Sequence, residues 1–346
     1  MKAEQAMLKV VGAGLHSTVQ DMGRTGFQDV GVPRSGPLDR ISFRLANALV
    51  GNPQDAPALE MLVQGPALEV MADSVRVAVV GANAPLEVEG ANRRTVAPGQ
   101  SATLVRGDVL RVSRLGDSAC AYLAVEGGID AAPSLGSVST YVRGSLGGLA
   151  GRPLRQGDLI PVRQGAAAAR GEQAMARPLD LGLRQTIRVV PGPQDDYFAA
   201  SALDAFLSGR YVVSAQADRM GFRLEGPVLE HAKGYNIVSD GIVAGSIQVP
   251  GSGLPIVLMA DAQTTGGYPK IATVISADIP VLGRRKPGME VRFAAVSVAE
   301  AEALRRRQEE DLLECMRSFR AVEGRAGMNL KALYSESLIS GVVYAR

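Results

Sequence analysis

Short apolar runs, bounded by Gly, Pro or Asp, recur along most of the chain. Six of the clearest runs are Val75–Val80, Leu110–Val112, Ala121–Val125, Ile187–Val190, Ile256–Met259 and Thr273–Ile275. Runs of this length, separated by turn residues at short intervals, are typical of the strands of a β-sandwich or barrel. The pattern therefore predicts a mostly β protein.

Helical spacing of apolar residues is found in three places. The predicted helices cover Leu38–Leu49, Tyr197–Leu207 and Ser297–Phe319. Gly51 supplies an end for the first helix. Asp195 and Asp196 precede the second, where acidic side chains suit the positive end of a helix dipole. Ser297 and Glu300 have the spacing of a capping box at the start of the third.

The stretch Gln164–Arg177, QGAAAARGEQAMAR, interrupts the β pattern near the middle of the chain. Its Ala, Gly, Gln and Arg content is typical of a linker or an exposed excursion. Each half of the chain has an early strand, a helix of about 12 residues and several short strands, which indicates two related lobes. We expect an N-terminal β lobe over 1–163, a linker over 164–180, a C-terminal β lobe over 181–296, and a C-terminal helix and tail over 297–346.

The amino-acid composition indicates a folded globular protein and argues against nucleic-acid-binding and membrane proteins. The chain has 346 residues, of which 46% are apolar and 21% charged, and its formal net charge is +2. These values support one or two packed cores and provide no clustered positive charge for binding nucleic acid. No apolar run reaches the ~18 residues of a membrane span, and the N-terminus lacks the apolar core of a signal peptide. We therefore expect a cytoplasmic protein with no nucleic-acid or membrane partner.

Several familiar motifs are missing from the sequence. The dipeptide Gly-Lys does not occur, so there is no nucleotide-binding loop of the GxxxxGK[ST] type. Cys120 and Cys315 are too few for a disulfide framework or a zinc site, and His16 and His231 lack metal-ligand spacing. We expect no bound metal.

Three polar, Gly-rich stretches contain the candidate catalytic and ligand-binding residues. The first of them is Thr18–Asp39. It contains Gln20, Arg24, Arg34 and Ser35 among four glycines. Glycine allows a ligand to approach the backbone closely, and an arginine can hold a carboxylate or phosphate through paired hydrogen bonds. The alternative interpretation is a series of turns in which Ser35 or Asp39 caps the following helix.

The second stretch is Ser239–Gly253, SDGIVAGSIQVPGSG. Asp240 and Gly241 form a strong turn signal. Ser246 and Gln248 are spaced by two, which places both side chains on one face of a short strand. A hairpin followed by a Pro-Gly turn is the alternative interpretation.

The third stretch, ADAQTTGGYPKI (260–271), holds the densest polar cluster. Its candidate residues are Asp261, Gln263, Thr264, Thr265, Gly266, Gly267, Tyr268 and Lys270. Apolar runs precede and follow it, so the cluster is predicted at a strand end, where loops on a rigid scaffold carry function. A hairpin needs far fewer polar residues. Lys270 precedes a strand that looks buried, and a partly buried lysine can act as an electrophile or bind an anion.

These stretches resemble the KipA-like family, also called allophanate hydrolase subunit 2 or the biotin-dependent carboxyltransferase domain family. The segments that carry the likeness are TVQDMGRTGFQDVGVPRSGPLD (18–39), ANALVGN (46–52), PGPQDDYF (191–198), DRMGFRLEGP (218–227), SDGIVAGSIQVPGSGLPIVLMADAQTTGGYPKIATV (239–274) and LGRRKPGMEVRF (282–293). The resemblance implies a pair of cyclophilin-like β-barrel lobes.

The resemblance also implies three alternative functions. A chain of this kind looks most like the C subunit of an ATP-dependent 5-oxoprolinase, which works with KipI-like and LamB/YcsF-like subunits on a small amide substrate. ATP would then bind through the complex. The second function is the carboxyltransferase part of a biotin-dependent urea carboxylase, and only this one involves biotin. The third is a regulatory partner of a KipI-like protein.

Roles for the candidate residues follow from the amide chemistry that the resemblance implies. We expect Lys270 to stabilise developing negative charge and Arg24 to hold the substrate carboxylate. Asp240 or Asp261 would orient donors or act as a base. The remaining substrate-binding candidates are Gln20, Ser35, Gln248, Gln263, Thr264, Thr265, Gly266, Gly267 and Tyr268. Part of the pocket is expected to come from a second protein chain.

Overall fold

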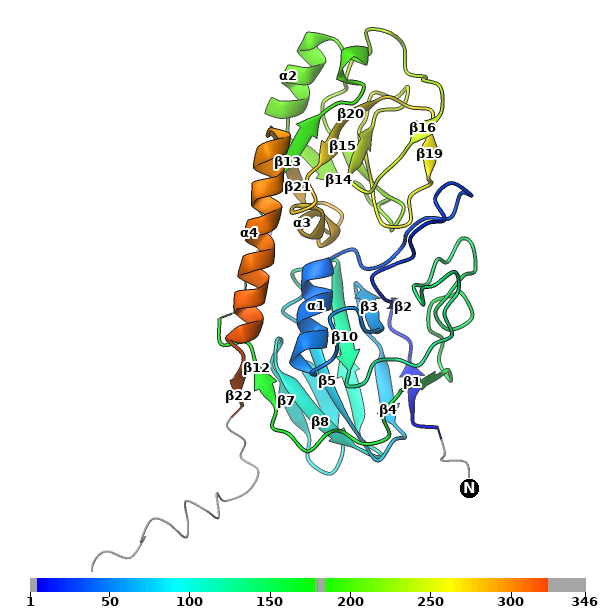
Figure 1. Ribbon diagram of the computed structural model, residues 1–346, viewed down its shortest axis with the longest axis vertical. Helices are drawn as coiled ribbons and strands as arrows, with labels where there is room; N and C mark the ends of the chain where they lie inside the picture. The colour runs from blue at the N-terminus through cyan, green and yellow to red at the C-terminus, as the bar shows by residue number, and fades with distance from the viewer. Residues whose placement is uncertain (1–4, 178, 180–183, 323–346) are drawn as a thin grey trace, which may run out of the picture.

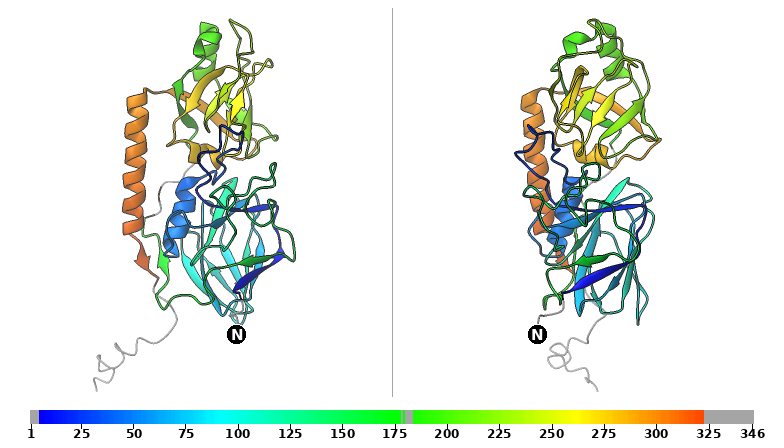
Figure 2. Two further views of the ribbon diagram at one scale, coloured as in Figure 1. Left: turned by 45° about the vertical axis from the view of Figure 1, so that its right-hand side comes forward. Right: turned by 90° about the vertical axis from the view of Figure 1, so that its right-hand side faces the viewer.

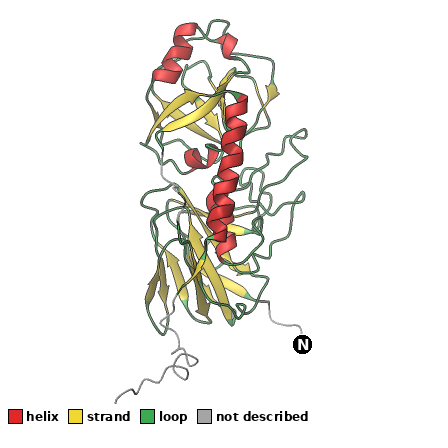
Figure 3. Ribbon diagram, turned by 60° about the vertical axis from the view of Figure 1, so that its left-hand side comes forward, coloured by secondary structure: helices red, strands yellow, loops and turns green. Residues whose placement is uncertain are grey.

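The computed structural model describes residues 5–177, 179 and 184–322, which form two β lobes lying end to end (Figure 1). The N-terminal lobe is the lower one in that view. The long helix α4 (Val298–Arg317) lies along one side of both lobes (Figure 3). The prediction of a mostly β, two-lobed chain with a few short helices and a C-terminal helix is confirmed.

Two antiparallel sheets pack against each other in the N-terminal lobe. Their strands are β1 (Met7–Gly12), β2 (His16–Gln20), β3 (Ala58–Leu62), β4 (Ala67–Val70), β5 (Ser74–Val80), β6 (Leu86–Glu89), β7 (Arg94–Val96), β8 (Ser101–Val105), β9 (Val109–Val112), β10 (Cys120–Val125) and β11 (Leu159–Pro161). One sheet has the order β11-β1-β4-β9-β6-β7 and the other β2-β3-β10-β5-β8. Apolar side chains from both sheets form one core.

Strand β10 shows why some of the apolar runs are continuous. All six of its residues are buried. Ala121 and Leu123 belong to the core between the sheets, whereas Tyr122 and Ala124 belong to the core that contains α1 (Arg40–Leu49). Because successive side chains of a strand point to opposite faces, a strand covered on both faces needs apolar residues throughout.

Helix α1 confirms the first predicted helix. Asp39 caps it, since its Oδ1 accepts hydrogen bonds from the amides of Ile41 (2.9 Å) and Ser42 (3.1 Å). This carboxylate satisfies amide groups that the first turn of a helix leaves unpaired. Gly51, just beyond the last turn, has a φ of 72°, a conformation that glycine adopts at no steric cost.

The C-terminal lobe is a closed barrel. Its strands are β13 (Thr186–Pro191), β14 (Tyr211–Val213), β15 (Gly221–Glu225), β17 (Ser246–Gln248), β18 (Ile256–Leu258), β20 (Lys270–Val274) and β21 (Glu290–Ala295). They follow the order β13-β20-β17-β18-β15-β14-β21, and β21 closes the barrel by pairing with β13 in parallel. A two-stranded ribbon of β16 (Asp240–Gly241) and β19 (Thr265–Gly266) lies beside the barrel.

The predicted start of the second helix is wrong. Asp195 and Asp196 lie in a separate 3-10 turn, η1 (Asp195–Tyr197), and α2 covers only Ala200–Ser208. Phe198 lies between the two and is extended, with a φ of −108° and a ψ of 148°. Its ring is buried in the core of the lobe, so packing of this aromatic side chain interrupts the helix that the acidic residues favour.

The segment predicted as a linker connects the lobes and binds the N-terminal lobe on its way. Buried Arg76 of β5 donates hydrogen bonds to the carbonyl oxygens of Ala168 (3.1 Å) and Arg170 (2.6 Å). After them, β12 (Gln173–Ala174) pairs with β22 (Arg320–Ala321), which follows α4. Both ends of the C-terminal lobe are therefore tied to the N-terminal lobe. The predicted tail beyond residue 322 lies outside the described residues, as do 178 and 180–183.

Helix α4 begins with the predicted capping box. Ser297 Oγ accepts a hydrogen bond from the Glu300 amide (3.2 Å), and the Glu300 carboxylate accepts one from the Ser297 amide (2.8 Å). Further along, Gln308 donates to the Ala277 carbonyl oxygen of the C-terminal lobe at 2.7 Å. Within the described ranges, no helix has an apolar stretch sufficient to cross a bilayer.

Arg219 forms a buried polar connection between the lobes. Its side chain, 6% exposed, pairs with Asp261 in the C-terminal lobe (Nε to Oδ2, 2.8 Å) and with Glu60 of β3 in the N-terminal lobe. It also donates to the Gly36 carbonyl oxygen at 2.8 Å. The second oxygen of Glu60 accepts a hydrogen bond from the Tyr122 hydroxyl at 2.7 Å. The network thus joins five separate segments of the chain, around Gly36, Glu60, Tyr122, Arg219 and Asp261.

The segment after β2 crosses the junction and lies against the C-terminal lobe (Figure 2). Its Ser35 amide donates to the Ala260 carbonyl oxygen at 3.0 Å. At the next contact, α3 (Ile279–Gly283) approaches so closely that a β-carbon on Gly283 would lie 2.6 Å from the Leu38 carbonyl oxygen. The lobes therefore meet through backbone as well as side chains.

We predict that Arg219→Met destabilises the protein by about 3–5 kcal/mol, because it leaves two buried carboxylates without their cation. Arg106→Met is the matched control. Arg106 pairs with Asp73 at the surface, where the two side chains are 59% and 80% exposed, and its loss should cost about 0–1 kcal/mol. The free energies of unfolding in urea, followed by circular dichroism, compare the two. Equal effects would contradict the structural role of Arg219.

Candidate active site

Two of the polar stretches meet on the C-terminal lobe. Strand β17 pairs with β20, and the register places Gln248 opposite Lys270. In the neighbouring ribbon, β16 pairs with β19, which places Asp240 opposite Gly266. Because residues that face each other across paired strands are neighbours, the stretches 239–253 and 260–271 form one site.

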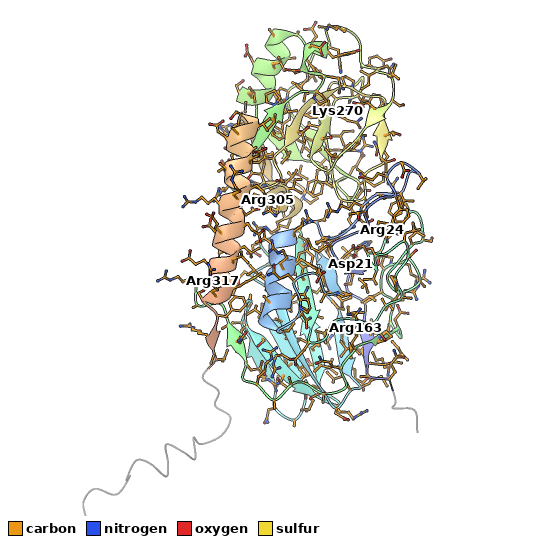
Figure 4. The ribbon with its side chains drawn as sticks, viewed as in Figure 1. Asp21, Arg24, Arg163, Lys270, Arg305 and Arg317 are labelled. Atoms are coloured by element: carbon orange, nitrogen blue, oxygen red, sulfur yellow. The ribbon has the colours of Figure 1, made fainter. Side chains whose placement is uncertain are left out.

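Lys270 is the cationic centre of this site. Its side chain is only 3% exposed, and its Nζ lies 2.7 Å from Asp240 Oδ2 and 3.4 Å from the Gly241 carbonyl oxygen. A buried ammonium needs such partners, because removing it from water unpaired is costly. Lys270 lies in the upper lobe, as Figure 4 shows.

Gln194, which was not among the predicted site residues, holds both members of this pair. Its Oε1 accepts a hydrogen bond from the Lys270 amide at 3.1 Å, and its Nε2 donates to Asp240 Oδ2 at 3.2 Å. The residue belongs to the segment PGPQDDYF, one of those that carry the family resemblance. That segment was the available signal for this residue.

Asp240 is held in its ionised form. The hydrogen bond from Lys270, assisted by those from the Gly241 amide and Gln194, holds the pKa of Asp240 below its ordinary value. A carboxylate stabilised in this way is a weak base near neutral pH. The geometry therefore suits Asp240 to orienting Lys270 better than to accepting a proton.

Gln248 supports the loop that carries Gln263 and Tyr268. Its side chain is 2% exposed, and its Nε2 donates to the Tyr268 carbonyl oxygen at 3.3 Å. Its Oε1 lies 3.4 Å from Gln263 Nε2. Gly266 packs directly against it, since a β-carbon there would clash with Gln248 Nε2. A buried amide with several partners fixes the positions of the more exposed groups around it.

Thr264, Thr265, Gly267 and Tyr268 form the outer part of this loop. The Thr264 and Gly267 carbonyl oxygens accept hydrogen bonds from the segment 237–242, each at 2.9 Å. Thr265 and Tyr268 are exposed, Tyr268 by 41%. These residues therefore lie around Lys270 at the surface, where a ligand or another protein has access.

Asp261 is directed away from this group. Both of its carboxylate oxygens are occupied by Arg219, at 2.8 Å and 3.1 Å, and its side chain is 5% exposed. No contact joins it to Lys270 within the described part of the chain. The structure thus brings Asp240 to Lys270 and assigns Asp261 to the connection between the lobes.

Gln20, Arg24 and Ser35 belong to a second group, on the N-terminal side of the junction. Figure 4 shows Arg24 well below Lys270. All three side chains are buried, and within residues 5–177, 179 and 184–322 four of their polar atoms have no hydrogen-bond partner. These atoms are Gln20 Oε1, Arg24 Nε, Arg24 Nη1 and Ser35 Oγ. Buried donors and acceptors without partners are rare and indicate an absent ligand or water.

Asp21 positions Arg24 through the loop at 137–139. Its carboxylate accepts hydrogen bonds from Ser139 Oγ (2.7 Å) and the Val138 amide (2.8 Å), and the Ser139 carbonyl oxygen accepts from Arg24 Nη2 at 2.6 Å. Burial by itself raises the pKa of Asp21, but these bonds and others from Ser137 and the Gly23 amide outweigh it, so the pKa is lowered. Burial lowers the pKa of Arg24.

The side chains that commonly bind metals are dispersed. Within the described ranges, His, Cys, Asp and Glu side chains do not gather in groups of three that could hold a metal ion.

Comparisons of sequence place this geometry in a family. A family model described as "Carboxyltransferase domain, subdomain A and B" matches residues 30–295. The chain is 39% identical over 303 residues to the C subunit of the 5-oxoprolinase of Escherichia coli, covering 88% of this chain and 96% of that protein. It is 34% identical over 303 residues to the C subunit of the Haemophilus influenzae 5-oxoprolinase, with the same coverage.

The fold is also similar to a solved structure. The crystal structure of the Kluyveromyces lactis urea carboxylase matches with a TM-score of 0.83 and 30% sequence identity. The match covers 91% of this chain and 30% of that one. The same fold therefore occurs both in proteins of similar length and within a much longer chain.

We predict that Gly266→Ala destabilises the protein by about 1 kcal/mol, because the end of the buried Gln248 side chain would have to move away from the new β-carbon and lose a hydrogen bond. The adjacent Gly267→Ala is the control, since its β-carbon would come no closer than 3.5 Å to the Ile237 carbonyl oxygen and should change stability by only about 0.5 kcal/mol. Unfolding in urea measures both. Equal stabilities would show that Gln248 is not packed as described.

Proposed function

This chain belongs to the family of carboxyltransferase domains, subdomains A and B, and we propose that it is a subunit of an ATP-dependent 5-oxoprolinase, which opens 5-oxoproline to glutamate. The observation that carries this proposal is the match, over 88% of this chain, with proteins named as the C subunit of 5-oxoprolinase. These two relatives are 39% and 34% identical to the chain, against 30% for the urea carboxylase structure.

The Lys270 group supplies what lactam cleavage needs. An amide carbonyl is a poor electrophile, and ATP would activate it by transferring its γ-phosphoryl group to the lactam oxygen, with ADP as the leaving group. Water would then add to the activated carbon, the ring C–N bond would break, and phosphate would leave. Negative charge develops on that oxygen and on the phosphoryl group, and donors already in position stabilise it. In this proposal Lys270 is the cation, with Gln263, Thr264 and the amides of Gly266 and Gly267 as neutral donors. Asp240 and Gln194 keep the ammonium in place.

Arg24 is proposed to bind a carboxylate on the N-terminal side of the junction, apart from the Lys270 group. Its buried guanidinium uses Nη2 for the Ser139 carbonyl oxygen and leaves Nε and Nη1 without partners in the described chain. These two donor nitrogens suit the two oxygens of a carboxylate. Gln20 and Ser35 supply the neighbouring unpaired atoms.

A second protein is part of the proposal, because Arg24 and Lys270 lie in different lobes and ATP needs a site. The proposed partners are a KipI-like protein and a LamB/YcsF-like protein. Exposed apolar side chains support a docking surface beside Lys270. They include Tyr235 (50% exposed), Val238 (91%), Val243 (58%) and Tyr268 (41%). Large apolar groups clustered at a surface are typical of protein interfaces.

The second candidate is the carboxyltransferase component of a biotin-dependent urea or amide carboxylase. The structural match with urea carboxylase favours it. Carboxylated biotin would supply the carboxyl group for the amide nitrogen. The amides and Gln263 beside Lys270 are hydrogen-bond donors of the kind that a ureido oxygen accepts. The two candidates use the same side chains on small amide substrates.

Lys270→Met tests the shared site. In an assay with all three proteins of the proposed complex, we predict a loss of turnover on the order of a hundredfold or more, because a well-placed donor to developing charge contributes about 3 kcal/mol. Lys9→Met is the control, since Lys9 lies at the surface and pairs with Glu69 at 3.4 Å. Both variants should fold and bind their partners normally. Near-normal turnover of Lys270→Met would remove this residue from the mechanism.

Inhibition by avidin, which binds biotin, distinguishes the two proposed functions. We predict that avidin added to a lysate leaves the amide-directed, ATP-dependent activity of this protein intact, because a 5-oxoprolinase uses no biotin. The measurement is the rate with and without avidin, with biotin-saturated avidin as the control. Inhibition by free avidin alone would instead identify the carboxyltransferase. Partner binding without activity on either amide would indicate a regulatory protein.

A further inference from the structure

A cleft at the lobe junction carries positive charge that the described residues do not neutralise. It has a volume of about 230 Å³ and lies between the segment after β2 and the C-terminal lobe. Its polar side chains are those of Gln28, Arg34 and Arg40 from the N-terminal half and Gln263 from the C-terminal lobe. The remaining lining residues are apolar, and none is acidic.

Three other cavities in the described part of the chain have acidic side chains in their lining. The cavity around Arg163 includes Asp21, Asp55 and Glu126. The cavity between α3 and α4 contains three aspartates among its arginines, and a third cavity pairs Arg106 with Asp73. Each of those places has carboxylates beside its arginines, although the cavity between α3 and α4 has four arginines to three aspartates. The cleft with Arg34 and Arg40 differs from these three because none of its described lining residues is acidic.

The charged groups around Arg40 add to the excess of positive charge at this cleft. Arg34, Arg44 and Arg305 are its charged neighbours, with Glu309 as the acidic one. Glu309 is already engaged, since it accepts two hydrogen bonds from Arg44 at 2.7 Å and 2.5 Å. Figure 4 shows Arg305 on α4 at the level of the junction. Burial, with the charges of the neighbouring arginines, lowers the pKa of Arg40 to about 10.

Four guanidinium groups around one carboxylate repel one another, and an anion between them lowers that repulsion. Arg40 is partly buried and Arg34 is exposed, so an anion can reach both. Within residues 5–177, 179 and 184–322, neither Arg34 nor Arg40 has a carboxylate at ion-pair distance. Guanidinium groups bind phosphate oxygens through paired hydrogen bonds, and the two glutamines add neutral donors. Pockets for whole drug-sized ligands are larger, roughly 300–1,000 Å³, so this cleft suits a small group.

We propose that this cleft binds a phosphate-type oxyanion, held by Arg34 and Arg40 from one lobe and by Gln263 from the other. The anion belongs either to free phosphate or to the phosphate end of a nucleotide. Because Gln263 also contacts Gln248, which lies opposite Lys270, the bound anion is next to the Lys270 group. The site does not depend on the 5-oxoprolinase proposal, since its charges come from Arg34 and Arg40 and not from Lys270.

Titration calorimetry on the full chain tests the proposal, with inorganic phosphate, pyrophosphate and ATP as separate probes. We expect saturable binding that weakens at least tenfold in Arg34→Gln and in Arg40→Gln. Arg111→Gln is the control, because Arg111 pairs with Glu89 on the surface of the N-terminal lobe, and it should bind within about twofold of the wild type. If pyrophosphate binds as tightly as ATP, the ligand is a free phosphate. If ATP binds more tightly than pyrophosphate, the ligand is a nucleotide.

Thermal unfolding without added anion shows whether the variants fold. Arg40→Gln removes one of several repelling charges, so its melting temperature should equal or exceed that of the wild type. The absence of saturable binding by the wild type would overturn the proposal. So would unchanged affinity in both Arg34→Gln and Arg40→Gln, since binding would then lie elsewhere.

Discussion

The buried guanidinium of Arg219 is the interaction on which the arrangement of the two lobes depends. An apolar contact tolerates sliding, whereas a guanidinium between Asp261 and Glu60 requires each oxygen in its place. With the lobes fixed in this way, the segment after β2 lies across the junction, and Arg34 lines the same cleft as Gln263. The network therefore determines the geometry of the cleft without any contact to the Lys270 group.

Polar side chains of the site fall into two kinds according to how their hydrogen bonds are used. Asp21, Asp240 and Gln248 have most of their bonding capacity taken up by neighbouring protein groups, so they hold other residues in position. Arg24, in contrast, retains donors that the described chain does not use, and the acidic neighbour of Arg40, Glu309, is engaged by Arg44. The first kind supplies rigidity, and the second is available for a ligand. This division explains why so many polar residues occur in three short stretches.

Much of the fold followed from local patterns in the sequence, whereas the site was harder to predict because its contacts join distant segments. The strand runs, α1 with its glycine end and the capping box of α4 each depend on residues close together in the chain. The start of α2, in contrast, depends on packing with distant residues. Burial of Phe198 in the core overrides the preference of Asp195 for a helix start. In the site, Asp261 belongs to the polar run around Lys270, yet Arg219 from another segment draws it to the lobe junction.

The most direct measurement of the central claim is ATP-dependent formation of glutamate from 5-oxoproline by the purified chain mixed with KipI-like and LamB/YcsF-like proteins of the same organism. We predict glutamate when all three proteins and ATP are present, and none when this chain is omitted. The same rate without this chain, or no glutamate from the complete mixture, would contradict that claim.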